Sequence, residues 1–142
     1  MQTFLPYPTY TDSVACLDST RLGNQVYNEG IILIRGGWSH HPASKMWQGY
    51  EHHLALYLLA GIKELSKRGL EYPETHKEIL QHLDEFPNTG PPHWLGNVDF
   101  HASHRSNLLR KNFRYYSQIG WTEPPNLPYI WPKGYGKLIL NV

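Results

Sequence analysis

The sequence has 142 residues, of which 40% are hydrophobic and 18% are charged, so a disordered chain is excluded and one buried core is possible. Its formal net charge is only +1, no apolar run reaches the ~18 residues of a membrane span, and the single cysteine excludes an internal disulfide. We therefore predict one domain over residues 1–142, working in the cytoplasm, either associated with the nucleoid or encoded by a virus in its host.

The first third predicts an arm followed by a long helix. Residues 1–10 contain two prolines and three aromatic rings, which favours an extended arm packed on the body. A helix is expected from about Asp18 to Arg35, because Asp18 can cap its start and Gly36-Gly37 can end it. One face of this helix combines three apolar residues with one carboxylate: Leu22, Val26, Glu29 and Leu33.

Three further helices are predicted, and the class is mainly α. The second runs from Pro42 to a stop at Gly69, the third from about Glu74 to Phe86, and the fourth from the cap Asn97 to about Tyr116. The second helix has an apolar stripe made of Trp47, Tyr50, Leu54, Tyr57, Leu58 and Leu65. Four prolines after Gly120 exclude regular helix there, and a weak strand signal covers residues 136–141.

The near-neutral total hides a basic C-terminal third. Residues 1–99 have a net charge of −4, whereas residues 100–142 have +5, with Glu123 as their one acid. Trp131 and Tyr135 alternate with lysines in this segment. Cations that neutralise phosphates, interleaved with rings that stack on bases, favour nucleic-acid binding. The alternative is a solvated helix face followed by a proline-rich wrap.

Glu29 is the first candidate for chemistry, because a carboxylate on the apolar side of a helix is costly unless it is paired or faces a cleft. In a cleft it could act as a general acid or base. The alternative is a structural carboxylate that pairs with Arg21 or a backbone donor.

The histidines are the second candidate. His101 and His104 could hold a metal in principle, but no third ligand or zinc motif accompanies them, so we predict contact with DNA or help in catalysis.

Six segments, in order along nearly the whole chain, resemble one known group of enzymes. They are Met1-Gln-Thr-Phe-Leu-Pro-Tyr7, Leu17-Asp-x-x-Arg-Leu-Gly-Asn-Gln25, Gly37-Trp-x-x-His-Pro-Ala43, Met46-Trp-x-Gly-Tyr-Glu51, His101-Ala-Ser-His-Arg-Ser-Asn-Leu-Leu-Arg-Lys111 and Leu127-Pro-Tyr-x-Trp-Pro132. The group is the phage-type endonuclease V family, the pyrimidine-dimer DNA glycosylases with AP-lyase activity, together with related bacterial and viral sequences. Tyr27-Asn-Glu29 is similar to the segment that holds the catalytic glutamate of the phage enzyme, and Trp131-x-Lys-x-Tyr-Gly-Lys137 is similar to its C-terminal segment at the lesion.

The resemblance implies a compact helical fold and a mechanism without metal or organic cofactor. The α-amine of the N-terminal residue attacks C1′ of the damaged nucleotide, an imine forms, and β-elimination cuts the strand. A free α-amino group suits this role near neutral pH because its pKa is about 7.7–8.0. Gln2 normally prevents removal of the initiator, so Met1 would carry the amine and Glu29 would assist it.

The expected partner is double-stranded DNA with damaged or modified bases, bound by a monomer. The predicted DNA-binding residues are Arg21, Gln25, His101, His104, Arg105, Arg110, Lys111, Arg114, Trp131, Lys133, Tyr135 and Lys137. Asn28 and Ile32 stand where the phage enzyme has arginines, so damage recognition is expected to differ. Two alternatives remain open at this stage: a DNA-binding module without catalysis, and a glycosylase for another modified base.

Overall fold

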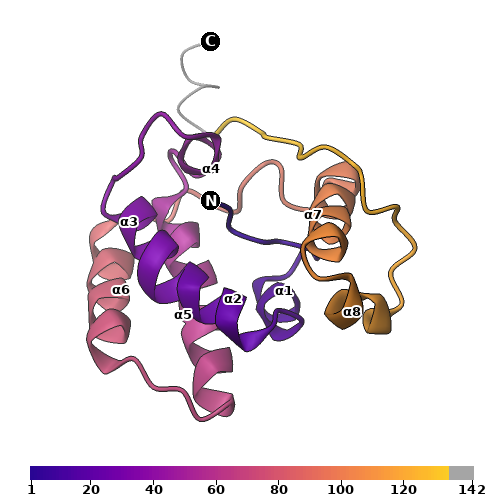
Figure 1. Cartoon of the computed structure of the whole chain (residues 1–142). Coiled ribbons are helices and arrows are strands. Elements are labelled where there is room, and N and C mark those ends of the chain that lie inside the picture. Colours follow the sequence, from indigo (N-terminus) through magenta and orange to yellow (C-terminus); the bar gives the residue numbers. More distant parts are fainter. Residues whose placement is uncertain (135–142) are drawn as a thin grey trace.

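In a computed structural model of the protein, the described residues, 1–134, form helices joined by irregular segments and contain no strand (Figure 1). The helices are α1 (Tyr10–Ala15), α2 (Ser19–Asn24), the π-helix η1 (Gln25–Gly30), α3 (Ile31–Ile34), α4 (Pro42–Lys45), α5 (Glu51–Lys67), α6 (Pro73–Glu85), α7 (Val98–Lys111), α8 (Phe113–Tyr116) and the 3-10 turn η2 (Ser117–Ile119). The prediction of a mainly α fold is confirmed. None of the helices within this range is long and apolar enough to span a bilayer.

Helix α5 is the centre of the packing. It contacts α1, α2, η1, α3 and α6, and its residues Leu54, Tyr57, Leu58 and Leu65 are all buried. In Figure 1, α7 and α8 lie on the other side of the molecule, and the N-terminal arm runs between them and this first group of helices. The arm is therefore an internal element that connects two groups of helices.

The first predicted helix is confirmed from end to end, but its middle is a π-helix. The Asp18 carboxylate accepts a hydrogen bond from the backbone N–H of Arg21 at 3.1 Å, and Gly36 follows the helix with φ +89°. Gly30 explains the wider turn, because a Cβ there would lie 2.4 Å from Leu58 Cδ2 and 2.5 Å from the carbonyl oxygen of Gln25. A π-turn inside an α-helix frequently marks a functional site.

The prediction of one continuous second helix is wrong, because the structure has two helices there, α4 and α5. Helix α4 begins at Pro42 as expected, but the chain turns over residues 46–50, where Gly49 has φ +87°. The Glu51 carboxylate accepts a hydrogen bond from the Gly49 N–H at 3.0 Å and stabilises this turn. Trp47 and Tyr50 are buried as predicted, although they lie in the turn rather than on a continuous helical stripe.

The fourth predicted helix is also interrupted, at Asn112. Asn97 caps α7 as predicted, by accepting a hydrogen bond from the Phe100 N–H at 2.9 Å. Asn112 has φ −151°, and its side chain accepts from the Tyr115 N–H at 3.2 Å, which starts α8. An Asn side chain competes with helical backbone bonds in this way, so the break has a local cause. The third helix agrees with α6 within one residue at each end.

The N-terminal arm is extended over its first residues and nearly buried, as predicted, but it is followed by a helix that was not predicted. Residues 2–6 are buried. Their backbone is bonded to side chains: Phe4 N–H donates to Gln25 Oε1 at 2.7 Å, and Leu5 N–H donates to His104 Nδ1 at 2.8 Å. Helix α1 then starts at Tyr10, with Thr9 as its cap. The arm is thus fixed by helices from both halves of the chain.

The burial of His104 predicts a loss of stability in acid. The ring lies in the core, and burial lowers its pKa from 6.5 to about 3. In the unfolded chain His104 binds a proton below about pH 6.5, whereas in the folded protein it stays neutral down to about pH 3. We expect this histidine to reduce the free energy of unfolding by roughly 1.4 kcal/mol per pH unit across that window.

Urea unfolding at pH 7 and pH 5 measures this effect. His104→Asn is the matched control, because an Asn oxygen can accept the Leu5 N–H but does not titrate. The buried His101 also has a lowered pKa, and it is present in both proteins. We expect the free energy of unfolding of the wild type to fall more than that of the variant, by roughly 1.4 kcal/mol for each pH unit below 6.5. Equal losses would mean that His104 takes up a proton while the protein is folded.

The segment after η2 has no regular structure over residues 121–134, as predicted, and it returns across α7 to α4 (Figure 1). Three α7 side chains bond to its backbone, and one of these bonds joins Asn107 Nδ2 to the Leu127 carbonyl at 3.1 Å. At its end, Gly134 N–H donates to the Lys45 carbonyl at 2.9 Å. The predicted strand at 136–141, and the predicted DNA contacts Tyr135 and Lys137, lie outside the described residues.

Candidate active site

A cavity of about 180 Å³ lies beside the N-terminus. Its walls come from the arm, α2, the π-helix, the end of α7 and the C-terminal segment. The lining residues are Met1, Gln2, Phe4, Arg21, Asn24, Gln25, Glu29, Lys111 and Tyr129. The two residues proposed for catalysis from the sequence, Met1 and Glu29, therefore line one cavity although 27 residues separate them in the chain.

The Glu29 side chain is half-buried, and its carboxylate is not engaged in a hydrogen bond or an ion pair within residues 1–134. The residue lies in the π-helix. Arg21 does not pair with it, because its guanidinium lies 2.8 Å from the Asp18 carboxylate. The structural alternative considered above, a Glu29–Arg21 pair, is therefore wrong. A carboxylate without a partner at the wall of a cavity can accept a proton or stabilise a nearby cation.

Met1 is held at the cavity by the buried residues that follow it. The Phe4 carbonyl accepts a hydrogen bond from the Tyr57 hydroxyl at 2.5 Å, and the Leu5 carbonyl accepts one from His101 Nδ1 at 2.7 Å. These bonds fix the arm within four residues of the amine. A nucleophile held in place this way needs no ordering of the chain at the moment of reaction.

The His41 ring lies close enough to the N-terminal amine and to the Glu29 carboxylate for both charges to affect its pKa. Burial is the largest cause of the lowered pKa of this histidine, the positive N-terminus lowers it further, and the Glu29 carboxylate opposes the shift. His41 Nδ1 accepts a hydrogen bond from the Ala43 N–H at 3.0 Å, so the neutral ring carries its proton on Nε2. No residue pattern around His41 predicts a functional role, although His41 stands in one of the six segments that carry the resemblance.

Two polar atoms of residues that line the cavity have no hydrogen-bond partner within residues 1–134. They are the amide nitrogen of Gln2 and the hydroxyl oxygen of Tyr129, both shielded from solvent. A buried polar group without a partner costs about 1–3 kcal/mol.

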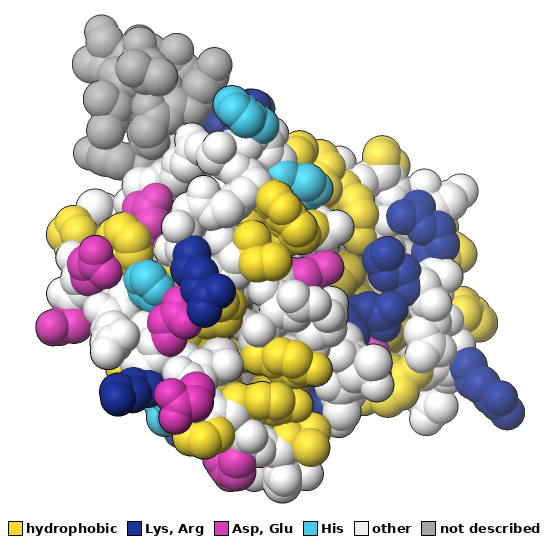
Figure 2. Space-filling view, turned by 60° about the vertical axis from the view of Figure 1, so that its left-hand side comes forward, with side chains coloured by type: hydrophobic (Ala, Val, Ile, Leu, Met, Phe, Trp, Pro, Cys, Tyr) yellow, Lys and Arg dark blue, Asp and Glu magenta, His cyan; other side chains and the backbone are white. Residues whose placement is uncertain are grey.

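The basic residues at the end of α7 and in α8 are accessible. Arg110, Lys111 and Arg114 are exposed, and Lys111 also lines the cavity. Figure 2 shows Lys and Arg side chains gathered on the right of the viewed face, whereas acidic side chains lie mostly on the left. Lys133 is exposed as well. These placements are compatible with phosphate contacts, which stay predictions.

Four other predicted DNA contacts have their polar atoms inside the protein. His101 and His104 are buried and bond the arm backbone. Gln25 is buried as well, between Phe4 N–H and the Tyr57 hydroxyl. Arg105 forms a bidentate pair with Glu123 at 2.9 and 3.0 Å and donates to the Pro6 carbonyl at 2.7 Å. All four side chains bond the arm, His101, His104 and Arg105 from α7 and Gln25 from the π-helix, so they have a structural role.

The remaining predicted residue, Trp131, is partly buried beside the site. Its ring lies 5.9 Å from His41 in an edge-to-face arrangement and 5.3 Å from Tyr129. For metals, no group of three or more His, Cys, Asp or Glu side chains within residues 1–134 is arranged to hold an ion.

A family model described as pyrimidine dimer DNA glycosylase matches residues 1–79, more than half of the chain. The chain belongs to this family. The resemblance inferred from the sequence is confirmed, and family membership supports a DNA repair glycosylase whose substrate is DNA with pyrimidine dimers. The match covers the arm and the π-helix with Glu29, and it ends inside α6. Comparison with curated proteins and with solved structures gave no match.

Proposed function

We propose that this protein breaks the bond between the sugar and one pyrimidine of a UV dimer and then cuts the strand at the resulting abasic sugar. The α-amine of Met1 is the nucleophile, and Glu29 assists the sugar chemistry. The observation that carries this proposal is the cavity, because Met1 and an unpaired Glu29 line it together.

The reaction begins when the neutral amine attacks C1′ of the damaged nucleotide. The bond from C1′ to the base breaks, its electron pair leaves with the base, and the base takes up a proton. The nitrogen then loses a proton, the C1′–O4′ bond breaks with protonation of the oxygen, and a protonated imine joins the protein to the sugar. The Glu29 carboxylate stabilises the positive charge that develops at C1′ and accepts a proton.

The second step cuts the strand. Removal of a proton from C2′ of the imine sends electrons toward C3′, where the C–O bond breaks and the phosphate leaves. Water then hydrolyses the imine and restores the amine. Lys111 lines the same cavity, and we expect its ammonium group to neutralise a phosphate that flanks the sugar.

An incision assay with three duplexes tests the proposal. They carry one thymine dimer, one abasic site, or no damage, and chelator is present throughout. We expect cutting at the dimer and at the abasic site and none in undamaged DNA. Cutting at the abasic site alone would support the imine mechanism but would mean that the enzyme excises a damaged base other than a pyrimidine dimer. No cutting, with binding that weakens steeply with salt, would favour a non-catalytic DNA-binding module.

A further inference from the structure

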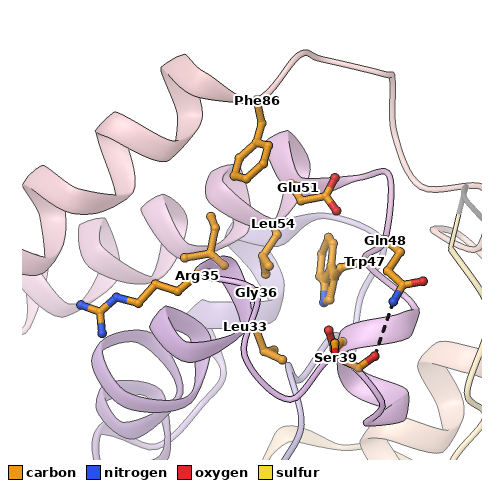
Figure 3. A pocket seen from close by; sticks show the side chains of 11 residues that line it. Leu33, Arg35, Gly36, Ser39, Trp47, Gln48, Glu51, Leu54 and Phe86 are labelled. Carbon is orange, nitrogen blue, oxygen red and sulfur yellow. Dashed lines mark hydrogen bonds between the residues drawn. The ribbon is translucent and has the colours of Figure 1, made fainter.

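A hollow of about 260 Å³ lies between the α3–α4 loop, helix α5 and the end of α6 (Figure 3). It shares no lining residue with the cavity that contains Met1 and Glu29. Much of its wall is apolar and comes from Leu33, Ile34, Trp47, Leu54 and Phe86. An apolar hollow with a few polar groups is the usual form of a small-molecule site, and this volume suits one ring with a short chain.

The walls of this hollow are fixed by the fold. His52 Nδ1 donates a hydrogen bond to the Phe86 carbonyl at 3.1 Å, which ties the end of α6 to α5. Trp47 Nε1 donates to Thr3 Oγ1 at 3.0 Å, so the turn before α5 is tied to the N-terminal arm. Because these contacts already order the walls, a ligand would bind with little further loss of side-chain freedom.

The polar groups on the wall are mainly hydrogen-bond acceptors. The Glu51 carboxylate accepts from the Gly49 N–H at 3.0 Å through Oε2, and within residues 1–134 no cationic side chain pairs with it. Gln48 Nε2 donates to the Ser39 carbonyl at 3.5 Å, which leaves Gln48 Oε1 as an acceptor (Figure 3). A ligand that supplies donors therefore fits this wall better than one that supplies acceptors.

The one cation on the wall, Arg35, does not neutralise Glu51. Its guanidinium forms two hydrogen bonds to the Glu78 carboxylate, at 2.7 and 2.6 Å. In Figure 3 the Arg35 guanidinium points away from the other lining side chains, whereas the Glu51 carboxylate lies among them. The charge that a ligand would meet in the hollow is therefore negative.

We propose that this hollow binds a small organic cation, an ammonium group on a short apolar or aromatic body, with the Glu51 carboxylate as its counter-ion. An ammonium group has three donors and no acceptor, which matches the acceptors of Glu51 and Gln48. Its hydrogen bond to a carboxylate is charge-assisted and hence stronger than a neutral one. The apolar body would cover Leu33, Leu54 and Phe86. The proposal goes beyond the proposed function and does not depend on it.

Three probes of nearly equal size test the charge preference by NMR titration at neutral pH: phenethylammonium, phenethyl alcohol and hydrocinnamate. We expect the ammonium ion to bind roughly 10- to 100-fold more tightly than the alcohol, and the carboxylate probe to bind most weakly. The backbone amide signals of Gly36 and Gln48, which line the hollow, should shift. The signal of Gly120, which lines neither this hollow nor the cavity of Met1, should not.

Glu51→Gln is the informative variant, because its amide oxygen can still accept the Gly49 N–H while the charge is lost. We expect it to bind the ammonium ion no more tightly than the alcohol. Glu29→Gln is the matched control, since it removes the carboxylate of the other cavity, and it should bind all three probes as the wild type does. Ser44→Leu places a larger side chain on the wall of the hollow and should weaken all three.

Three results would overturn the inference: equal affinity of the wild type for the ammonium ion and the alcohol, an undiminished preference in Glu51→Gln, or shifts that spare Gly36 and Gln48. Failure of the proposed function is separate. If the wild type prefers the ammonium ion and Glu51→Gln does not, but neither protein cuts damaged or abasic DNA, the cation site stands and the lyase proposal falls.

Discussion

Glu29→Gln is expected to slow release of the damaged base by about 10²- to 10⁴-fold, the usual contribution of one general acid or base. Glutamine keeps the size and polarity of the side chain but can neither accept the proton nor carry the negative charge. Because Glu29 has no hydrogen-bond or ion-pair partner in the described part of the chain, the substitution breaks no structural contact. Single-turnover measurements on a dimer duplex give the rate.

The matched control for this variant is Glu74→Gln, which removes an exposed carboxylate at the start of α6, remote from the cavity. It should cut at the wild-type rate. The Glu29 variant should also bind duplex DNA with unchanged or slightly higher affinity, because a negative charge has been removed near phosphates. A wild-type rate of base release in Glu29→Gln would remove this glutamate from the mechanism.

Blocking the α-amine is expected to have an equally large effect. An N-terminally acetylated protein has no lone pair available on that nitrogen, so it should form no borohydride-stable adduct and should cut abasic DNA only at the background rate. The arm bonds at Phe4 and Leu5 do not involve the amine, so unfolding in urea should be unchanged. An acetylated protein that still forms the adduct would exclude the N-terminal nucleophile.

The helices that could be predicted from the sequence are those with local signals. Asp18 and Asn97 cap helices as predicted, and Gly36 and Gly69 end helices with positive φ. The break at Gly49 could not be predicted, because a single glycine inside an apolar stripe is compatible with both a helix and a turn. Tertiary packing decides it, since the turn buries Trp47 against the arm through a 3.0 Å bond to Thr3.

The candidate site residues divide in the same way into those that the sequence predicts and those that it does not. Glu29 could be predicted because a carboxylate on an apolar helix face requires an explanation. The histidines of α7 were misinterpreted because the segment from His101 to Arg105 has the composition of a basic surface, whereas the buried arm covers it.

The most direct measurement is to locate the covalent bond. Protein whose N-terminus has been verified by mass is incubated with an abasic duplex, reduced with borohydride, digested and mapped by mass spectrometry. We predict a single adduct on the α-amine of Met1. An adduct on Lys111, the side-chain amine that lines the same cavity, or no adduct at all, would contradict the proposed mechanism.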